Sequence, residues 1–334
     1  MIAHGGVDAG LFRGAIYESG ALSAFPWDTP TSNSSNLIFD GVAATLGCSN
    51  SSDKLACIRD VPFTTFYDAF NPANNGSQPN VQATIDGDLI AENPVKALAE
   101  GKYVKVPTMI GHNMDEGALF TAVPSADNDT ALIALLNSNS SKVSLTVVSY
   151  PYLSSHLDNL LELYPNIPSE GVPYGQFDNQ TIPNAGSQWR RAASIIGDLA
   201  VIAPVRWSAQ IFNKTQPVYK FVFNGTYASG FPAFFGATHG LEIAFIFNDP
   251  TLLNTTAEHN LAHVVSRTWI SFVSELDPNH HGVAGLPHWD VYSNGPDGVY
   301  FDLQQDLPIT LKSDDFRKEG IALINQVKSE LNMV

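Results

Sequence analysis

Three short apolar segments, two of them followed at once by polar turns, constrain the fold of this chain more than any other feature. Residues 12–17, 106–111 and 217–223 are apolar or alternating runs of strand length. The letters ESG follow the first run, and HNMDEG follows the second. Runs of this kind, bounded by Gly, Pro and polar residues, predict buried strands. Because α/β folds carry their chemistry at the carboxyl ends of parallel strands, the polar residues that end these runs are the first functional candidates.

Helical periodicity fills the sequence between and after the predicted strands. A helix is expected over residues 93–101, which have Pro in the first turn and Gly at the end. Two longer helical patterns cover residues 189–214, interrupted at Pro204, and residues 257–276. The last pattern has one apolar stripe, formed by Leu261, Val264, Val265 and Trp269. Strands that alternate with helices indicate an α/β protein.

Length and composition favour one globular domain over residues 1–334. The chain has 334 residues, of which 44% are hydrophobic and 15% are charged, as in proteins with a large buried core. It contains no internal repeat and no long low-complexity linker. Residues 30–76 and 124–186 are rich in loop residues and short helical patterns, so they are expected to be excursions from that core.

The charge balance excludes several classes of partner. The 17 Lys and Arg residues are outnumbered by 33 Asp and Glu residues, which gives a net charge of −16. A field of this sign repels nucleic-acid phosphates and anionic lipid surfaces, so neither is an expected partner. No apolar run approaches the roughly 20 residues of a transmembrane helix. The first ten residues, MIAHGGVDAG, lack the basic and apolar parts of a secretion signal.

Glycosylation motifs and a pair of cysteines nevertheless favour an extracellular protein. The only two cysteines, Cys48 and Cys57, enclose a Ser-rich loop without nearby His partners for a zinc site, so a local disulfide is favoured over two free thiols. We therefore expect a secreted glycoprotein whose signal peptide lies upstream of Met1. Nine Asn-x-Ser/Thr motifs without a middle Pro are present, at Asn33, Asn50, Asn75, Asn128, Asn139, Asn179, Asn213, Asn224 and Asn254.

Several motifs, in this order, resemble the type-B carboxylesterases, a branch of the α/β hydrolases that contains Candida rugosa-type fungal lipases and cholinesterases. They are GLFRGAIYESG, the loop between the two cysteines, IDGDLI, VPTMIGHNMDEGALF, VYKFVFNG, FGATHGLEIAFIF, and the late WISFVSELDPN and LPHWDVY. The resemblance extends from the first residues to about Tyr292. It implies an α/β-hydrolase fold and hydrolysis of carboxylic esters through Ser, Glu and His.

By this resemblance, Glu116 in MDEG is the acid of a catalytic triad and His239 in ATHG is the general base. His239 would take a proton from the attacking hydroxyl and return it to the leaving alcohol. Glu116 would fix the tautomer of His239 and stabilise the imidazolium. Spacing alone leaves two alternatives open, with Asp115 as the acid and His112 as the base.

The nucleophile is the triad member that the resemblance does not locate in this chain. A nucleophile elbow requires G-x-S-x-G, and the sequence contains no such motif. Ser19, in YESGA, has Tyr17 and Ala21 where the elbow needs glycines, so it is predicted to be a structural residue at a strand end. In the family the nucleophile precedes segments like GLFRGAI, so the serine and the oxyanion loop are expected upstream of Met1. This implies the C-terminal part of one domain, an incomplete α/β-hydrolase fold that has no turnover alone.

Two His residues have the spacing of metal ligands. His259 and His263 are four residues apart, but no Glu lies between them as in H-E-x-x-H and no third ligand is evident. A solvated helix face is therefore the preferred interpretation. The sequence implies no cofactor and no metal.

The substrate is indicated only by class. Phe231, Phe234 and Phe235 precede His239 and belong either to an apolar wall of the acyl site or to core packing. The expected partner is a small-molecule or lipid ester, and the oligomeric state stays open. Two alternative functions remain, a truncated product without catalysis and a binding or adhesion protein with the esterase fold.

Overall fold

The computed structural model describes residues 1–22, 33–71, 83–121, 126–137, 155–173, 185–227, 232–293, 298–305 and 308–332. Phe231 and the glycosylation motifs at Asn75, Asn139 and Asn179 lie outside the described residues, as does the side chain of Asn33. Among the remaining motifs, the Asn residues at 50, 128 and 254 are exposed, and those at 213 and 224 are half-buried.

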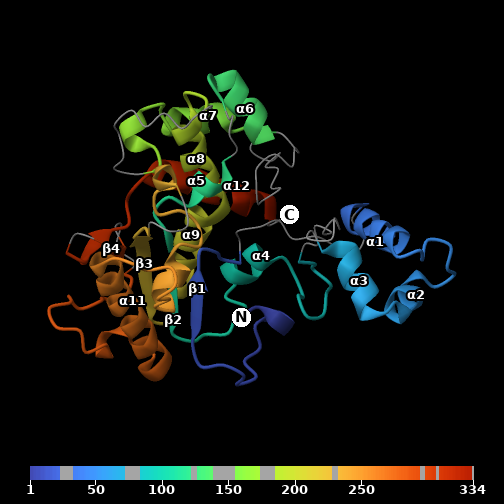
Figure 1. The fold of residues 1–334 in the computed structure, drawn as a ribbon, viewed down its shortest axis with the longest axis horizontal. Helices are drawn as coiled ribbons and strands as arrows, with labels where there is room; N and C mark the ends of the chain where they lie inside the picture. The colour runs from blue at the N-terminus through green and yellow to red at the C-terminus, as the bar shows by residue number, and fades with distance from the viewer. Residues whose placement is uncertain are drawn as a thin grey trace.

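The described strands form one mixed sheet in the order β1-β2-β3-β4-β5 (Figure 1). The first four strands are parallel, and β5 is antiparallel to β4. Ala15 pairs with Thr108, which pairs with Val218, so the first three strands bring their carboxyl ends to one edge of the sheet. The strands are β1 Ala15–Glu18, β2 Thr108–Asn113, β3 Val218–Asn224, β4 Val299–Gln304 and β5 Thr310–Ser313.

The three strands predicted from the sequence are β1, β2 and β3, with their ends moved by a few residues. The α-helices that accompany the sheet are α1 Asn33–Thr45, α2 Lys54–Asp60, α3 Phe63–Phe70, α4 Pro94–Ala99, α5 Glu116–Phe120, α6 Asp129–Asn137, α7 Leu157–Leu163, α8 Trp189–Gly197, α9 Ala203–Phe212, α10 Glu242–Ile246, α11 Thr256–Glu275 and α12 Lys318–Asn332.

The two faces of the sheet carry separate apolar cores, because successive strand residues point to opposite faces. Ile110 and Val218 join a cluster that includes residues of α8, α9 and α12. Met109, Tyr219 and Phe221 join a second cluster with residues of α10 and α11. Helices therefore cover both faces, which is why the parallel strands are apolar on both sides.

One long helical segment, Trp189–Phe212, packs in the first of these cores. It consists of α8, a π-helical turn η5 (Asp198–Ile202) and α9. Pro204 lies in the first turn of α9 and has no N–H to donate, and the predicted interruption is the π-helical turn that precedes it. By length and composition this is the one described segment that could cross a membrane, and 83% of its apolar window is buried inside the protein.

The helix predicted over residues 257–276 is α11, which covers the second face. Thr255 and Glu258 form a capping box that fixes its start. Val264 is half-buried, and the other residues of the predicted stripe are buried, namely Leu261, Val265 and Trp269.

Helices α1, α2 and α3 lie to one side of the sheet (Figure 1). Neither α2 nor α3 contributes a buried residue. A disulfide joins Cys48, which follows α1, to Cys57 in α2. With few core contacts, this helical excursion depends on the disulfide as a local cross-link.

Candidate active site

Glu116 begins α5 directly after the turn that follows β2. Its position depends on a close approach of α5 to α8. A Cβ atom at Gly117 would lie 1.9 Å from the carbonyl oxygen of Ala193, and one at Gly197 would lie 2.7 Å from the backbone nitrogen of Gly117. Only glycines allow the two helices to be this close, and the contact fixes the backbone next to Glu116.

The carboxylate of Glu116 is fully buried and has three hydrogen-bond partners. Its Oε1 atom accepts from the Ser19 hydroxyl at 2.6 Å and from the backbone N–H of Asn113 at 2.6 Å. Its Oε2 atom lies 2.7 Å from Nδ1 of His239. A buried carboxylate needs such partners, and together they orient Oε2 toward the imidazole.

The loop that carries His239 is anchored by Asp115. The N–H of Asp115 donates to the carbonyl of Ala237 at 3.0 Å, and the N–H of Ala237 donates back to Oδ2 of Asp115 at 2.8 Å. Gly236 has a φ of 61°, and a Cβ atom there would lie 2.2 Å from the Asp115 carboxylate. Asp115 thus positions the loop, and the acid that contacts the imidazole is Glu116.

The imidazole of His239 combines a buried side with an accessible one. Its side chain is 35% exposed, whereas that of Glu116 is 0% exposed. The ring packs against Phe120 with the centroids 4.8 Å apart. In the parts of the chain that the structure describes, no residue hydrogen-bonds Nε2. If Nδ1 carries the proton donated to Glu116, Nε2 keeps the lone pair that a general base requires.

The charge of Glu116 sets the basicity of His239. Burial opposes protonation of the imidazole, but the hydrogen bond and the negative charge of Glu116 outweigh it and raise the pKa of His239 above its usual value. A carboxylate that favours the imidazolium stabilises the state formed when a base accepts a proton.

Ser19 is the third side chain at this edge, and its contact with Glu116 was not predicted. It follows β1 in the left-handed region with a φ of 53°, and it is 8% exposed. Its N–H donates to the carbonyl of Gly111 at 3.0 Å, and its hydroxyl donates to Glu116. Because the hydroxyl is directed at the acid and not at His239, Ser19 is not arranged as a nucleophile.

A second buried carboxylate, that of Glu242, lies near the carboxylate of Glu116. The side-chain amide of Asn113 donates to the carbonyl of Thr238 at 2.7 Å and to Oε2 of Glu242. Glu242 is 3% exposed, and burial followed by the charge of Glu116 raises its pKa to about 7. The sequence signal that could have found Glu242 is its place three residues after His239, in the first turn of a helix.

His112, the alternative base, is buried on β2 and directed elsewhere. Its Nδ1 atom lies 2.9 Å from the carbonyl oxygen of Asn113, and its ring lies against Phe316 with the centroids 6.0 Å apart. Burial, followed by the charge of Lys220, lowers the pKa of His112 well below its usual value. It makes no contact with Glu116 that would orient it as a base.

The remaining candidates are two aromatic residues before His239 and two His residues of α11. Phe234 and Phe235 are half-buried with ring centroids 4.4 Å apart, and Phe235 also packs on a core cluster that includes Trp189. His259 and His263 are both exposed on α11. Among the residues that the structure describes, no group of three or more His, Cys, Asp and Glu side chains could hold a metal ion.

The family of the chain is shown by comparison with known protein families. The model of the carboxylesterase family matches residues 4–318. The chain belongs to the carboxylesterase family. The family predicted from the sequence motifs is thereby confirmed.

The carboxylesterase-family relatives include fungal lipases. The chain is 32% identical to Secreted lipase 1 of Botryotinia fuckeliana (strain B05.10) over 293 residues, which cover 85% of this chain and 47% of the relative. It is 29% identical to Lipase 4 of Diutina rugosa over 316 residues, covering 93% of this chain and 53% of the relative. The chain thus spans about half the length of these relatives.

The fold is that of the α/β hydrolases. The structure of EstA from Aspergillus niger matches with a TM-score of 0.73 at 22% identity, over 99% of this chain and 60% of that chain. The predicted α/β-hydrolase fold is confirmed by this match together with the mostly parallel sheet covered by helices on both faces, whereas its incompleteness stays a prediction.

Proposed function

We propose that this carboxylesterase-family chain provides the acid and the general base of a carboxylic ester hydrolase that acts through Ser, Glu and His. The observation that carries the proposal is the contact of 2.7 Å between Oε2 of Glu116 and Nδ1 of His239. The contact lies at the carboxyl edge of a parallel sheet, where α/β enzymes carry out their chemistry.

In the proposed mechanism, His239 moves a proton twice in each half-reaction. Its Nε2 atom takes the proton of a serine hydroxyl as the oxygen attacks the ester carbonyl, and then gives this proton to the leaving alcohol. The acyl-enzyme is hydrolysed by water in the same way, which releases the acid and restores the serine. Glu116 holds the ring and stabilises each imidazolium.

The nucleophilic serine of this mechanism comes from polypeptide outside the 334 residues. Three observations support this part of the proposal. The sequence has no G-x-S-x-G motif, the hydroxyl of Ser19 is directed at Glu116, and the chain spans about half the length of its relatives. We therefore propose that residues 1–334 are the C-terminal part of one α/β-hydrolase domain and do not turn over alone.

The exposure of β1 also supports the proposal that residues 1–334 are part of a larger domain. All four residues of β1 are only half-buried, whereas every residue of β2 is buried. Parallel strands are usually covered on both sides. In the described part of the sheet, β1 pairs with β2 alone, which leaves one edge for a further strand.

The proposed substrate is a small-molecule or lipid ester. Phe120 lies against the His239 ring, and the half-buried Phe234 and Phe235 precede it, so apolar surface is available for an acyl group near the base. The relatives named lipases support an ester with an apolar acyl chain.

The test begins with the transcript upstream of the Met1 codon, read in frame. We expect it to encode a strand followed by G-x-S-x-G. The extended product and the 334-residue chain are then compared for hydrolysis of p-nitrophenyl esters and for labelling by a fluorophosphonate. The extended product should be active and labelled, and the short chain should be neither. Ester hydrolysis that survives His239→Ala in the extended product would overturn the proposal.

The lack of a nucleophile-elbow serine in the 334 residues also supports a non-catalytic function. In that case the chain would be a binding or adhesion protein with the esterase fold, or a truncated product. The transcript distinguishes the two functions, since a start codon at Met1 with no upstream frame favours the non-catalytic one.

We further propose that the protein is secreted. The nine glycosylation motifs and the Cys48–Cys57 disulfide support this location, because disulfides persist in oxidising compartments. Relatives that are named secreted lipases support it as well.

A further inference from the structure

Hydrogen bonds join the acid segment, residues 113–119, to the base loop, residues 236–242, in addition to the Glu116–His239 contact. They connect Asp115 to Ala237 in both directions, Leu119 to Thr238, and Asn113 to Thr238 and Glu242. Two segments that are far apart in the sequence therefore form one hydrogen-bonded unit around the acid and the base.

Asn113 is the residue whose hydrogen bonds reach both the acid and the base loop. Its backbone N–H donates to Oε1 of Glu116 at 2.6 Å, and its side-chain amide donates to the carbonyl of Thr238 at 2.7 Å. The same amide nitrogen donates to Oε2 of Glu242, in the first turn of α10. Because Thr238 directly precedes His239, one fully buried residue holds the acid and also the backbone next to the base.

The chemistry of these partners fixes the orientation of the Asn113 amide. The backbone carbonyl of Thr238 can only accept, so the NH2 group of Asn113 must face it. The amide oxygen of Asn113 is then buried without a hydrogen-bond partner among the described residues. An unsatisfied buried acceptor is costly, so what Asn provides here, and an apolar residue of the same shape does not, is the pair of donated bonds.

Glu242 anchors the far end of the base loop without needing a charge. Burial, followed by the charge of Glu116, raises the pKa of Glu242 to about 7. The amide of Asn113 is a neutral donor, and the carboxyl group has an oxygen that accepts in either protonation state. The bond therefore holds the start of α10 whether or not Glu242 is ionised.

The position of the base loop determines the environment of His239. Its Nδ1 atom lies 2.7 Å from Oε2 of Glu116, and this hydrogen bond and charge raise the pKa of His239. Glu242 is the other charged group that acts on the imidazole. Because hydrogen bonds weaken as the two atoms separate, a base loop that Asn113 no longer held would lose part of this contact.

We propose that Asn113 is a positioning residue of the ester hydrolysis, which holds the base loop against β2 so that His239 stays in contact with Glu116. This role rests on the proposed function, in which Glu116 is the acid and His239 is the general base. The Asn113 side chain is fully buried, so it acts through these two residues and not by contact with the substrate.

The first test is an NMR titration of the imidazole protons in the 334-residue chain and in its Asn113→Leu variant. Leu has nearly the shape of Asn and no charge, so the change removes the side-chain donors and leaves the charge of Glu116 in place. We expect the pKa of His239 to fall by at least about 0.5, because an opposite charge acts strongly only at close range. The signal of His239 is identified by its loss in His239→Gln.

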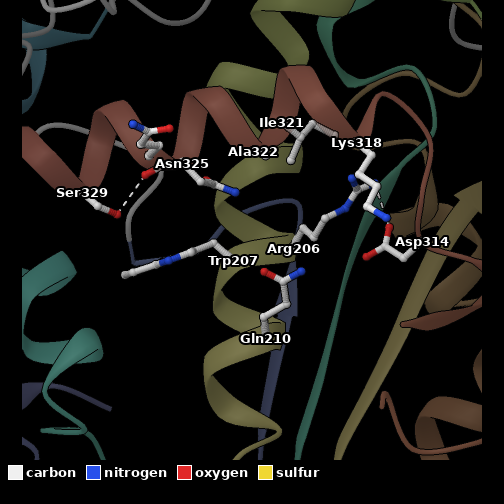
Figure 2. A pocket seen from close by; sticks show the side chains of 10 residues that line it. Arg206, Trp207, Gln210, Asp314, Lys318, Ile321, Ala322, Asn325 and Ser329 are labelled. Carbon is white, nitrogen blue, oxygen red and sulfur yellow. Dashed lines mark hydrogen bonds and ion pairs between the residues drawn. The ribbon is translucent and has the colours of Figure 1, made fainter. Parts of the chain in front are cut away.

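Asn325→Leu is the matched control, because it makes the same chemical change at another half-buried Asn. Asn325 is on α12, in the wall of a cavity of about 360 Å³ between α9 and α12 (Figure 2). No residue of the acid segment or of the base loop lines this cavity. The control should leave the pKa of His239 unchanged, whereas a loss of stability alone would change the amount of folded protein and not this pKa.

Asn113→Ser keeps the proposal testable if Asn113→Leu fails to fold, because Ser is small and polar and its shorter side chain does not reach Thr238. It should lower the pKa of His239 as well. In the extended product, Asn113→Leu should lower kcat by about 10–100-fold and change KM by less than about twofold, because a displaced base slows the chemistry and not substrate binding.

The positioning role of Asn113 is overturned if its folded variants have the same His239 pKa as the Asn325→Leu control. It is also overturned if Asn113→Leu keeps its kcat in an extended product that needs His239. An extended product without activity in its native sequence would instead overturn the proposed function, and the pKa comparison would still decide whether Asn113 holds His239 at Glu116.

Discussion

At the scale of single residues, the Glu116–His239 contact makes a prediction that needs no turnover. Replacement of Glu116 by Gln removes the charge that raises the pKa of His239, so the burial that opposes protonation should dominate and this pKa should fall. An NMR titration of the imidazole protons in both proteins measures the change. An unaltered pKa in the Gln variant would contradict the assignment of Glu116 as the partner of His239.

The same pair has a defined effect on stability. The folded pKa of His239 lies above its unfolded value, so its contribution to the free energy of unfolding is complete below the unfolded pKa and disappears as the pH rises through the folded pKa.

In an extended product that hydrolyses esters, Glu116→Gln should also lower kcat by up to about 10⁴-fold, the size of the loss when a triad acid becomes an amide.

Glu242 gives a second pH dependence at the residue scale. Its folded pKa of about 7 exceeds its ordinary value of 4.5, because it is buried beside Glu116. Folding therefore favours the protonated form, and the free energy of unfolding should decrease as the pH rises from 4.5 to 7. Glu242→Gln should remove about 3 kcal/mol of this decrease, at about 1.4 kcal/mol per pKa unit.

Urea unfolding at a series of pH values tests the Glu242 prediction. The facing groups are the carboxylate of Glu116, the imidazole of His239 and the amide of Asn113, so the measured slope belongs to the coupled set. Glu275→Gln, at an exposed site on α11, is the matched control and should leave the slope unchanged. If Glu242→Gln behaves like this control, Glu242 does not titrate as described.

The residue scale also marks a limit of prediction from sequence. Glu116 and His239 were predicted because short motifs identify them. Ser19 bonds to Glu116 across 97 residues, and Asn113 bonds to Glu242 across 129. Local sequence patterns do not predict such contacts, because they form only after the parallel strands bring their carboxyl ends together.

At the scale of elements, the approach of α5 to α8 should be intolerant of any side chain. A Cβ atom at Gly117 would overlap the carbonyl of Ala193, so Gly117→Ala should push α5 away and destabilise the fold by about 1–3 kcal/mol. The displacement should also move Glu116 and lower the pKa of His239. Gly41→Ala in α1, where nothing lies within 4 Å of the added atom, is the control.

The control should be neutral or stabilising by up to about 1 kcal/mol, because Ala favours a helix over Gly. Thermal unfolding compares the two variants. Equal tolerance of Ala at both positions would show that the contact between α5 and α8 does not hold Glu116 in place.

Element positions were predicted where periodicity is strong and missed where it is not. The regular helical pattern of residues 257–276 predicted the bounds of α11 to within about a residue, and the apolar runs predicted β1, β2 and β3. Strands β4 and β5 were not predicted, since their short segments near the C-terminus carry no distinctive alternation. The interruption predicted at Pro204 is the π-helical turn η5, which ends two residues before this proline.

At the scale of the whole molecule, the described sheet is asymmetric. Its last strand, β5, is antiparallel and short, whereas its first strand, β1, is parallel, half-buried and paired on one side within the described residues. A parallel edge of this kind is the natural place for further strands of the same domain. The acid and base lie at the ends of β2 and of the loop after β3, close to that edge.

The last prediction concerns the proposed secretion, which belongs to the scale of the whole molecule. Enzymatic glycosylation requires an Asn side chain that is accessible in the folded or folding chain. Asn50 and Asn128 are exposed, whereas Asn213 is half-buried and its Nδ2 atom donates to the carbonyl of Tyr292 at 3.1 Å. Glycans at Asn213 would break this contact, so we expect occupancy at the first two sites and not at the third.

Mass spectrometry of peptides deglycosylated by PNGase F in ¹⁸O-water measures this occupancy after secretion from a eukaryotic host. Asn50→Gln should remove one glycan from the intact mass, and Asn213→Gln should remove none. Because both variants keep the fold's charge and nearly its volume, a difference between them reports accessibility alone. Equal loss from both variants would contradict the structural argument, and the absence of glycans at Asn50 and Asn128 would contradict the proposed extracellular location.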